Sequence, residues 1–361
     1  MSEIKNNKAL IAMSGGVDSS VAAYIMQNQG FECTGVTMKL FYNEEIGVNG
    51  ESSCCSLSDV EDAKSVAYRL GIPYYVFNFT GDFKKHVIDR FVETYEQGGT
   101  PNPCIDCNRF LKFEKLFNRA KELQIDYIVT GHYAQVVYDE KLNRYLLKKA
   151  VDETKDQSYV LYSLTQEQLA HIKFPLGSYH KSEIREIASQ QGFLNAHKKD
   201  SQDICFVPDG DYASFIERYT GKTYPSGNFV DLNGNKLGVH NGSIRYTIGQ
   251  RKGLGLSLKT PHYVCKKCME TNQVVLGENS DLFSSELDAV DINLIAYDYL
   301  KEPIRVKAKV RYRHKEQWAT VSQPEPDRLH IVFDEPQRAI TSGQAVVLYQ
   351  DDIVVGGGTI V

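Results

Sequence analysis

The stretch AMSGGVDSSVAAYIM, residues 12–26, decides the fold because it changes from one structural pattern to another within a few residues. An apolar run at residues 9–13 leads into it and has the length of a buried strand. Beyond Gly15 and Gly16, apolar side chains recur at helical spacing, and Gly30 stands where a helix commonly ends. The stretch therefore predicts a strand, a tight glycine loop and the first turns of a helix.

The composition is typical of a soluble globular protein. The chain has 361 residues, 42% of them hydrophobic and 24% charged, which allows two or three domains with their own cores. No apolar run approaches the roughly 20 residues of a membrane span, and the first residues lack a secretory signal pattern. We expect a cytoplasmic protein with no membrane partner, whose cysteines are reduced. Because the net charge is −5, a nucleic-acid site would need a local basic surface.

The first half of the chain alternates between strand and helix patterns. We expect strands at residues 31–41, 73–79 and 127–130, and helices at 58–70, 82–97, 108–123 and 181–191. Ser58 and Glu61 have the spacing of a capping box at the start of the first of these helices. Repeated alternation of this kind predicts an α/β fold in which helices cover a parallel sheet.

The second half changes character after about residue 205. Glycine and turn signals crowd residues 221–255, and short strands are expected at 304–312, 318–322, 329–334, 345–349 and 353–361. That spacing favours a small antiparallel barrel or sandwich. We therefore expect an α/β domain over residues 1–207, a small central domain over 208–282 and a C-terminal antiparallel β-barrel over 283–361.

The glycine loop has the chemistry of an anion site. Consecutive backbone N–H groups at a helix N-terminus attract anions, and Gly15 and Gly16 let the backbone come close to one. Ser14, Ser19 and Ser20 add hydroxyl groups. The loop has neither the Gly-Lys-Ser/Thr of a Walker A motif nor the G-x-G-x-x-G spacing of a dinucleotide site. It resembles the pyrophosphate loop, SGGxDS, of the N-type ATP pyrophosphatases (the PP-loop enzymes), which split ATP into AMP and pyrophosphate and place AMP on a substrate oxygen. The alternative is a glycine-rich turn with a serine cap.

Two cysteines are candidate nucleophiles. In TPNPCIDCNRFLKF (100–113), Cys107 directly precedes an expected helix and lies near Arg109 and Lys112, which should favour its thiolate. In KDSQDICF (199–206), Cys205 follows a polar loop. The alternative for either thiol is a small buried hydrophobe.

Two CxxC pairs are also present, Cys104 with Cys107 and Cys265 with Cys268. Such a pair is half of a zinc site or a redox pair, although the two lie further apart in the chain than in a compact four-cysteine site.

Together these stretches resemble one family, the tRNA-specific 2-thiouridylases, which place sulfur at C2 of the wobble uridine. The resemblance covers nearly the whole chain. Its further motifs are TPNP, TGHYA (130–134), KDQSYVLY (155–162), KKDSQDICF (198–206), TIGQRKGLG (247–255), RYR (311–313) and SGQAVVLY (342–349). It implies a PP-loop domain of the adenine-nucleotide α-hydrolase type and a tRNA-uridine 2-sulfurtransferase activity.

The resemblance also implies roles for single residues. ATP would be bound by Ala12, Met13, Ser14, Gly15, Gly16, Val17, Asp18, Ser19, Met38 and Gly131, with Asp18 near the phosphates and Mg²⁺. The target base would lie against Asn102, Pro103 and Cys104, and tRNA would contact His132, Lys155, Asp156, Gln157, Arg311, Tyr312 and Gln344. Cys205 would carry a persulfide and Cys107 would be the second catalytic cysteine. No residue is assigned to a resident metal.

The reaction that the resemblance implies begins with adenylation of the uracil C2 oxygen. Sulfur would reach Cys205 from a donor protein, either a sulfur-relay protein or a cysteine desulfurase. The persulfide then attacks C2 directly, or Cys107 first releases hydrosulfide from it. Both routes end in a Cys107–Cys205 disulfide that a reductant must reopen.

The sequence departs from the family pattern at Cys104, where many members have an aspartate that is a proposed acid/base. Here Asp106 supplies the carboxylate, or the step proceeds without one. Cys54, Cys55, Cys265 and Cys268 lie outside the pattern and receive no role.

Residues 304–312 alternate apolar and basic side chains without a break. Strand periodicity would place the basic ones on one face, as a track for phosphates: Arg305, Lys307, Lys309, Arg311 and Arg313. Arg245, Arg251 and Lys252 add a basic glycine-rich loop. The alternative is an ordinary solvated sheet face.

Two other functions are compatible with parts of the pattern. A PP-loop ligase or amidotransferase would activate a carbonyl for ammonia and would not need Cys107 and Cys205. A non-catalytic zinc-containing RNA-binding protein would use the CxxC pairs.

Overall fold

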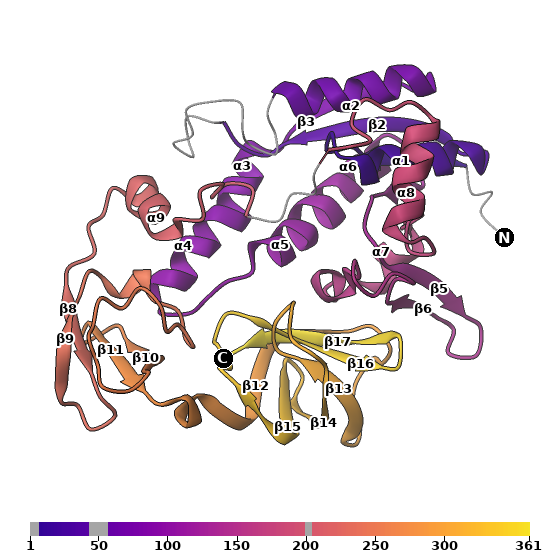
Figure 1. Ribbon diagram of the computed structural model, residues 1–361. Coiled ribbons are helices and arrows are strands. Elements are labelled where there is room, and N and C mark those ends of the chain that lie inside the picture. Colours follow the sequence, from indigo (N-terminus) through magenta and orange to yellow (C-terminus); the bar gives the residue numbers. More distant parts are fainter. Residues whose placement is uncertain (1–6, 43–56, 199–203) are drawn as a thin grey trace. The chain divides into compact units, whose positions relative to one another are not determined.

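The computed structural model describes residues 7–42, 57–198 and 204–361 (Figure 1). The chain forms two compact units, which we describe separately. Unit 1 contains residues 1–87, 104–210 and 352–355, and unit 2 contains residues 88–103, 211–351 and 356–361. Neither unit is a single stretch of chain.

Unit 1 is built on a five-stranded parallel sheet. Its strands, in the order β3-β2-β1-β4-β7, are β3 (Tyr74–Asn78), β2 (Glu32–Lys39), β1 (Lys8–Ala12), β4 (Tyr127–Val129) and β7 (Ile172–Lys173). Every neighbouring pair is parallel, and Ile11 of the central strand lies opposite Gly35 on one side and Val129 on the other. The expected parallel sheet is confirmed.

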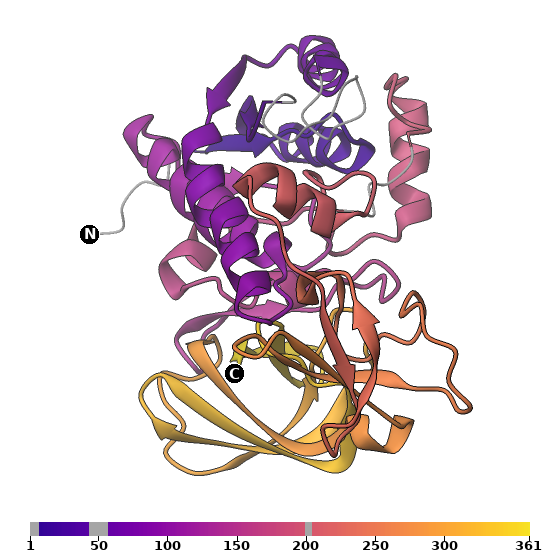
Figure 2. The ribbon, with the colours of Figure 1, turned by 90° about the vertical axis from the view of Figure 1, so that its left-hand side faces the viewer.

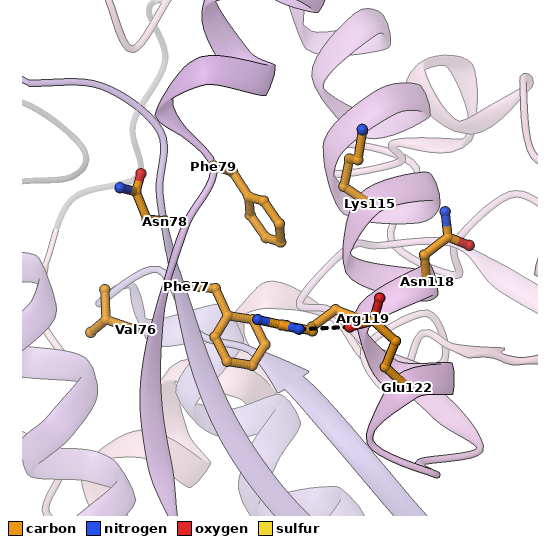
Figure 3. A pocket seen from close by; sticks show the side chains of 8 residues that line it. All are labelled: Val76, Phe77, Asn78, Phe79, Lys115, Asn118, Arg119 and Glu122. Atoms are coloured by element: carbon orange, nitrogen blue, oxygen red, sulfur yellow. Dashed lines mark hydrogen bonds and ion pairs between the residues drawn. The ribbon is translucent and has the colours of Figure 1, made fainter.

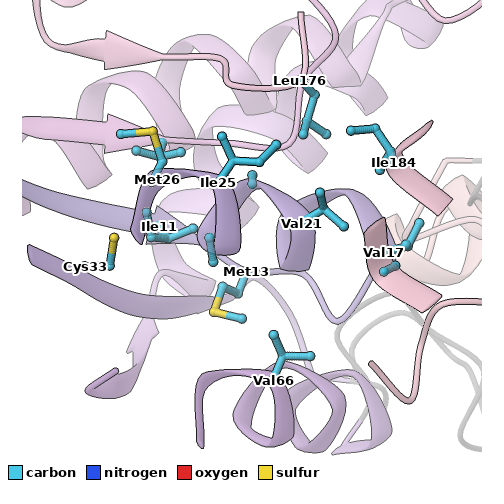
Figure 4. Close-up of a cluster of buried hydrophobic side chains, with 14 of the residues drawn as sticks. Ile11, Met13, Val17, Val21, Ile25, Met26, Cys33, Val66, Leu176 and Ile184 are labelled. Atoms are coloured by element: carbon cyan, nitrogen blue, oxygen red, sulfur yellow. The ribbon is translucent and has the colours of Figure 1, made fainter. Parts of the chain in front are cut away.

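Three helices pack on this sheet through one apolar core (Figure 4). They are α1 (Val17–Asn28), α2 (Leu57–Leu70) and α8 (Lys181–Gln190). Their core side chains include Val21, Val66 and Ile184, which meet Ile11 and Met13. All three helices were expected, but α2 begins at Leu57, so Ser58 lies inside the helix and not at its cap.

The expected end of α1 is confirmed in detail. Gly30 has φ +84° and donates to Gln27 O at 2.9 Å, while Phe31 N donates to Met26 O at 3.2 Å. These two bonds form a Schellman motif, which satisfies carbonyls that the helix end would otherwise leave unpaired.

Two longer helices contain π-helical segments. One runs through α3 (Thr80–Phe83), a π segment η1 (Lys84–Ile88) and α4 (Asp89–Glu96). The other runs through α5 (Pro103–Asp106), a π segment η2 (Cys107–Lys115) and α6 (Leu116–Glu122). The expected start of the second helix at Asn108 is wrong. It begins at Pro103, whose fixed φ and missing N–H suit the first turn of a helix.

Unit 1 also contains a hairpin that the sequence analysis did not predict, formed by β5 (Gln135–Asp139) and β6 (Arg144–Lys148). A 3-10 turn, η3 (Ser158–Leu161), and α7 (Gln166–Ala170) follow it. Lys148 pairs with Ile353, and Lys149 N donates to Asp352 O at 2.8 Å. The hairpin is thus completed by residues from far along the chain.

Unit 2 contains most of a closed antiparallel barrel of six strands, whose last strand begins with residues that belong to unit 1 (Figure 2). In barrel order they are β12 (Phe283–Leu294), β15 (Arg328–Arg338), β14 (Gln317–Glu325), β13 (Ile304–Lys309), β16 (Ala345–Gln350) and β17 (Ile353–Ile360). The barrel closes where Ala289 of β12 pairs with Ile360 of β17. Of the two architectures expected here, the structure forms the barrel.

A second, four-stranded sheet in unit 2 occupies the region of dense glycine and turn signals. Its order is β10 (Tyr263–Cys268), β11 (Gln273–Gly277), β8 (Gly227–Val230) and β9 (Lys236–His240), and two 3-10 turns accompany it, η4 (Ser243–Arg245) and η5 (Asn279–Leu282). Phe229, Tyr246 and Val274 fill its small core.

A helix that the sequence analysis did not predict, α9 (Tyr212–Thr220), precedes this sheet. It packs on α4 within unit 2: the Tyr95 and Tyr212 rings stack at 4.5 Å, and Phe91 and Phe215 meet edge to face at 6.3 Å. Within the described part of the chain, no helix has the length and apolar character to cross a membrane.

Candidate functional site

The glycine loop joins β1 to α1 and is shaped by its own side chains. Gly15 has φ +72°, and a Cβ there would lie 2.5 Å from Asp59 O, so the position requires glycine. Ser19 and Ser20 each donate from Oγ to Gly16 O at 3.0 Å. Gly16 is the N-cap of α1, and no side chain caps this helix. The arrangement fits an anion held by backbone N–H groups at the helix N-terminus.

Asp18, in the first turn of α1, is held by two groups that the sequence analysis did not assign. Lys181 Nζ donates to both carboxylate oxygens, at 2.7 and 2.8 Å, and Tyr133 OH donates to Oδ1 at 2.8 Å. Lys181 is the first residue of α8 and is only 8% exposed. A buried ammonium group therefore lies beside the expected phosphate site.

Two segments of unit 1 that are distant in the sequence also contact the glycine loop. A Cβ at Gly131 would lie 2.8 Å from Asp18 C and Ser19 N, so this glycine lets the chain after β4 approach the loop closely. Asn195 Nδ2 donates to Gly15 O at 3.0 Å and to Ser20 Oγ at 2.9 Å. The structure thus brings the expected segment 12–19 together with Gly131, and Met38 lies near the C-terminal end of the neighbouring strand β2. Nucleotides commonly bind at this edge of a parallel sheet.

Cys107 lies one turn inside its helix, at the first residue of the π segment η2. Burial raises the pKa of its thiol to about 11, and although Lys112 opposes this shift, Cys104 and Asp106 add to it. The prediction that this thiolate is favoured is wrong for the structure described here, because the thiol is not at the helix N-terminus and its surroundings disfavour charge.

Cys205 lies in a turn of unit 1 and is partly exposed. The adjacent Phe206 packs its ring against Phe83 of α3 at 5.7 Å, and α3 in turn packs against the π segment that begins at Cys107. Among the described residues, neither Cys107 nor Cys205 forms a disulfide, and the exposed Cys104 forms none either. Both catalytic candidates therefore lie on segments that pack around α3. Residues 199–203 of the Cys205 motif lie outside the described residues, as do Cys54 and Cys55.

Metal ligands do not cluster in the residues that the structure describes: no three His, Cys, Asp or Glu side chains gather in that part of the chain. Cys265 and Cys268 both lie on β10, and Cys265 Sγ donates to Tyr263 O at 3.4 Å.

Comparison with known proteins shows the family to which the chain belongs. The model described as tRNA methyl transferase HUP domain matches residues 7–209, the tRNA methyl transferase PRC-barrel domain matches 213–278, and the aminomethyltransferase beta-barrel domain matches 284–360. A tRNA-specific 2-thiouridylase MnmA from Clostridioides difficile (strain 630) is 52% identical over 355 residues, which cover 98% of both chains. Another from Acetivibrio thermocellus is 53% identical over 358 residues, covering 99% of this chain and all of the relative. The chain belongs to the tRNA-specific 2-thiouridylase family.

The thiouridylase motif KDQSY, expected at tRNA, is linked to the glycine loop in this structure. Asp156 accepts from Ala150 N at 3.0 Å and from Ser158 Oγ at 2.7 Å. Gln157 Oε1 accepts from Tyr133 N at 3.0 Å, and Gln157 N donates to Tyr133 O at 2.9 Å. Gln157 thereby fixes the tyrosine that contacts Asp18. Lys155, the third residue assigned to tRNA in this motif, is half-buried.

His132, another expected tRNA contact in the thiouridylase pattern, is buried in unit 1. Its Nδ1 lies 2.6 Å from Thr130 Oγ1, and its ring packs against Phe113 and Phe174. Burial lowers the pKa of His132 well below its usual value, and the charge of Lys112 adds to this effect. The imidazole is therefore neutral at physiological pH, and its position favours a structural role.

In unit 2, the thiouridylase residue Gln344 holds the segment that leads to Asn102 and Pro103. Its Nε2 donates to Thr100 O at 2.8 Å and to Pro101 O at 3.2 Å.

Arg311 does not lie on the expected basic face, because β13 ends at Lys309 and residues 311–313 form a turn. Its guanidinium donates to Ala339 O at 2.9 Å and to Thr341 Oγ1 at 2.7 Å. The prediction of one face with five basic residues is therefore wrong beyond Lys309, although Tyr312 in the same turn is exposed.

The structure also shows a hollow of about 400 Å³ in unit 1 that the family motifs do not reach (Figure 3). On one side it is lined by Phe77 of β3 and by Phe79, which follows this strand. On the other side the helix opposite contributes Lys115, Asn118 and Arg119. None of the residues expected at the site lines this hollow.

Proposed function

We propose that this protein forms 2-thiouridine at the wobble position of tRNA in an ATP-dependent reaction. The observation that carries the proposal is the pyrophosphate-type loop, with Asp18 held by Lys181 and Tyr133, in a chain 52% identical over nearly its whole length to a tRNA-specific 2-thiouridylase. A tRNA substrate also implies a cytoplasmic enzyme. Two candidate catalytic thiols in the same unit, Cys107 and Cys205, support this activity over ligation or amide formation.

The first step activates the uracil. Its C2 oxygen attacks the α-phosphorus of ATP, an O–P bond forms, and pyrophosphate leaves. The N–H groups at the start of α1 and the ammonium group of Lys181 stabilise the charge on the departing phosphates. Adenylation turns the C2 oxygen into a good leaving group, AMP.

Mg²⁺ fits this site as a partner of the nucleotide. It commonly keeps several waters and binds through one or two carboxylates together with substrate phosphates, so a set of three protein ligands is not required. Asp18 is the carboxylate that would hold it, and the ion would supply neutralisation of phosphate charge.

The second step transfers sulfur. A donor protein, either a sulfur-relay protein or a cysteine desulfurase, leaves a persulfide on Cys205. In one route the terminal sulfur attacks C2 and expels AMP, and Cys107 then attacks Cys205 Sγ. The S–S bond breaks, the thiocarbonyl sulfur stays on the base and a Cys107–Cys205 disulfide forms. In the other route Cys107 attacks first and releases hydrosulfide, which then displaces AMP. In both routes the two cysteine sulfurs together supply the two electrons that reduce the transferred sulfur, one electron each, and so form the disulfide. An external thiol reductant restores the cysteines.

Cys107 must lose its proton for either route. Because burial keeps its pKa at about 11, the resting group is a thiol. We propose Asp106 as the group that accepts this proton, since its charge already acts on the same thiol and Cys104 occupies the position where many family members have an aspartate.

The direct test is mass spectrometry of nucleosides from an unmodified tRNA transcript, after incubation with the protein, ATP and a persulfide donor. Wild-type protein should form 2-thiouridine and release AMP. Cys205→Ser should form none while keeping its affinity for ATP, because the loop is untouched. Cys268→Ser, which alters a partly exposed cysteine outside the family pattern, should retain activity. Continued thiolation by Cys205→Ser would refute the assignment of the persulfide.

A further inference from the structure

Trp318 is the only tryptophan in the chain, and the structure places it on the outer face of the barrel in unit 2. Its side chain is 48% exposed. It lies directly opposite Lys307 in the β13–β14 pair, and the neighbouring Val306 and Ala319 point into the barrel and are fully buried. Trp318 therefore takes no part in filling the barrel core.

Three cations surround this aromatic surface. The Arg305 guanidinium lies 5.2 Å and the Lys307 ammonium 5.3 Å from the indole centroid. Lys309 Nζ lies 5.8 Å from the ring of Tyr312, which is 38% exposed. Asp334 pairs with Arg305, with Nη1 and Oδ1 at 2.6 Å, so a carboxylate offsets the charge of this arginine.

A cross-strand Lys–Trp pair can simply stabilise a sheet surface. That role does not require half of the indole to remain exposed to water. Trp318 is also the only tryptophan in the sequence. Tryptophan and arginine are typical of binding surfaces. Exposed aromatic rings between cations are the common means by which proteins bind unpaired nucleotides, because the ring stacks on a base while the cations bind the adjacent phosphates. The positive charges on this face are therefore complementary to RNA phosphates, although the protein as a whole has a net charge of −5.

We propose that Trp318 is a stacking platform for one unpaired base of the bound tRNA, with Lys307 and Lys309 on the flanking phosphates. Side chains two residues apart on a strand are about 6.8 Å apart and share a face, so the two lysines can reach neighbouring phosphates. This inference rests on the proposed function, since it names a contact of the same substrate.

The protein provides its own reporter, because all tryptophan fluorescence comes from Trp318. Titration with an unmodified tRNA transcript should quench this emission in a saturable manner, with the same midpoint as a binding curve from filter retention. Emission that stays constant while filter retention shows the tRNA to be bound would overturn the proposal. So would emission that responds only to the sulfur-donor protein, since the face would then bind a protein.

Variants separate stacking from charge. Trp318→Leu should weaken tRNA binding about tenfold, in line with the usual value of one stacked base, and leave the salt dependence unchanged. Trp318→Tyr should keep most of the affinity. Lys307→Gln should reduce the slope of log K against log salt by about 0.7, the value for one phosphate contact on a single strand.

Phe283→Leu is the matched control, since Phe283 lies on β12 of the same barrel and is 45% exposed. Its tRNA affinity should equal that of wild type. If wild-type protein binds tRNA and forms 2-thiouridine but Trp318→Leu binds equally well, this inference alone is wrong. If wild-type protein neither binds nor thiolates tRNA, the proposed function fails and this inference with it.

Discussion

The ion pair between Lys181 and Asp18 determines the charge at the start of α1, beside the glycine loop. Lys181 is nearly buried, whereas the Asp18 side chain is 29% exposed, so the carboxylate is the more accessible partner of the pair. Without nucleotide the two charges offset each other. In the proposed ATP complex, the ammonium group would also interact with the phosphates, and Asp18 would bind a cation that accompanies them.

Lys181→Met should therefore weaken ATP binding by about 10- to 100-fold, the usual value of one or two hydrogen bonds to a charged group. Isothermal titration with ATP and Mg²⁺ measures this, and thermal melting shows whether the fold persists. Lys121→Met is the control, because Lys121 forms an exposed ion pair with Glu167, which contributes little to stability. Unchanged ATP affinity in a folded Lys181→Met protein would contradict the role given to this lysine.

At the scale of elements, the helix from Pro103 to Glu122 determines the state of Cys107. Its start at Pro103 moves the thiol away from the helix N-terminus, and its π segment places the thiol in a buried environment. A thiol with a pKa of about 11 is ionised in only about one molecule in a thousand at pH 8.

Alkylation of Cys107 by iodoacetamide should accordingly be slow at pH 7 and rise about tenfold for each pH unit up to pH 10, because only the thiolate reacts. Peptide mass spectrometry gives the rate at each cysteine, and the exposed Cys104 in the same peptide region serves as an internal comparison. A rate for Cys107 that levels off below pH 8 would mean that its surroundings favour the thiolate after all.

The sequence predicted those elements whose signals lie within a few consecutive residues. The glycines that end α1 and α2 and the apolar spacing of the central strands are visible in the sequence, and so is the glycine loop. A π segment is not visible, because it differs from an α-helix only in which carbonyl each N–H reaches. The short strands β5 and β6 lack a clear alternation, and β8 to β11 are hidden by the turn residues around them.

The same distinction between local and distant signals applies to the residues of the candidate site. The loop residues were predicted because their chemistry depends on contiguous backbone. Lys181 was missed since it lies 163 positions from its partner Asp18. His132 is buried and Arg311 donates to Ala339 O, and such contacts with distant segments cannot be predicted from a short motif. The expected contacts of both residues with tRNA stay predictions.

For the whole molecule, the notable feature is that residues 88–103 belong to unit 2. Phe91 and Tyr95 of α4 are almost fully buried, and Phe215 and Tyr212 of α9 cover them. Asp89 accepts from Tyr219 OH at 2.6 Å, and Glu96 pairs with Lys222 at 2.7 Å. The segment thus depends on residues that come well over a hundred positions later.

A fragment of residues 1–207, the α/β domain expected from sequence, should therefore be unstable. Exposing two large aromatic side chains costs roughly 3–6 kcal/mol, a large part of the 5–15 kcal/mol that typically stabilises a domain. We expect the fragment to aggregate in size-exclusion chromatography and to bind a hydrophobic dye, whereas the full chain does neither. A monomeric fragment with a cooperative melting transition would show that these contacts are dispensable.

Because residues 352–355 belong to unit 1, this unit cannot complete its folding until the end of the chain has been synthesised. The β5–β6 hairpin obtains its pairing at Lys148 and its ion pair with Asp352 only after about 200 further residues have left the ribosome. Until then, nascent unit 1 carries an exposed strand edge, which is prone to pair with other chains. Translation speed and chaperone supply should thus affect the yield of this protein more than that of one whose domains are each encoded in one continuous segment.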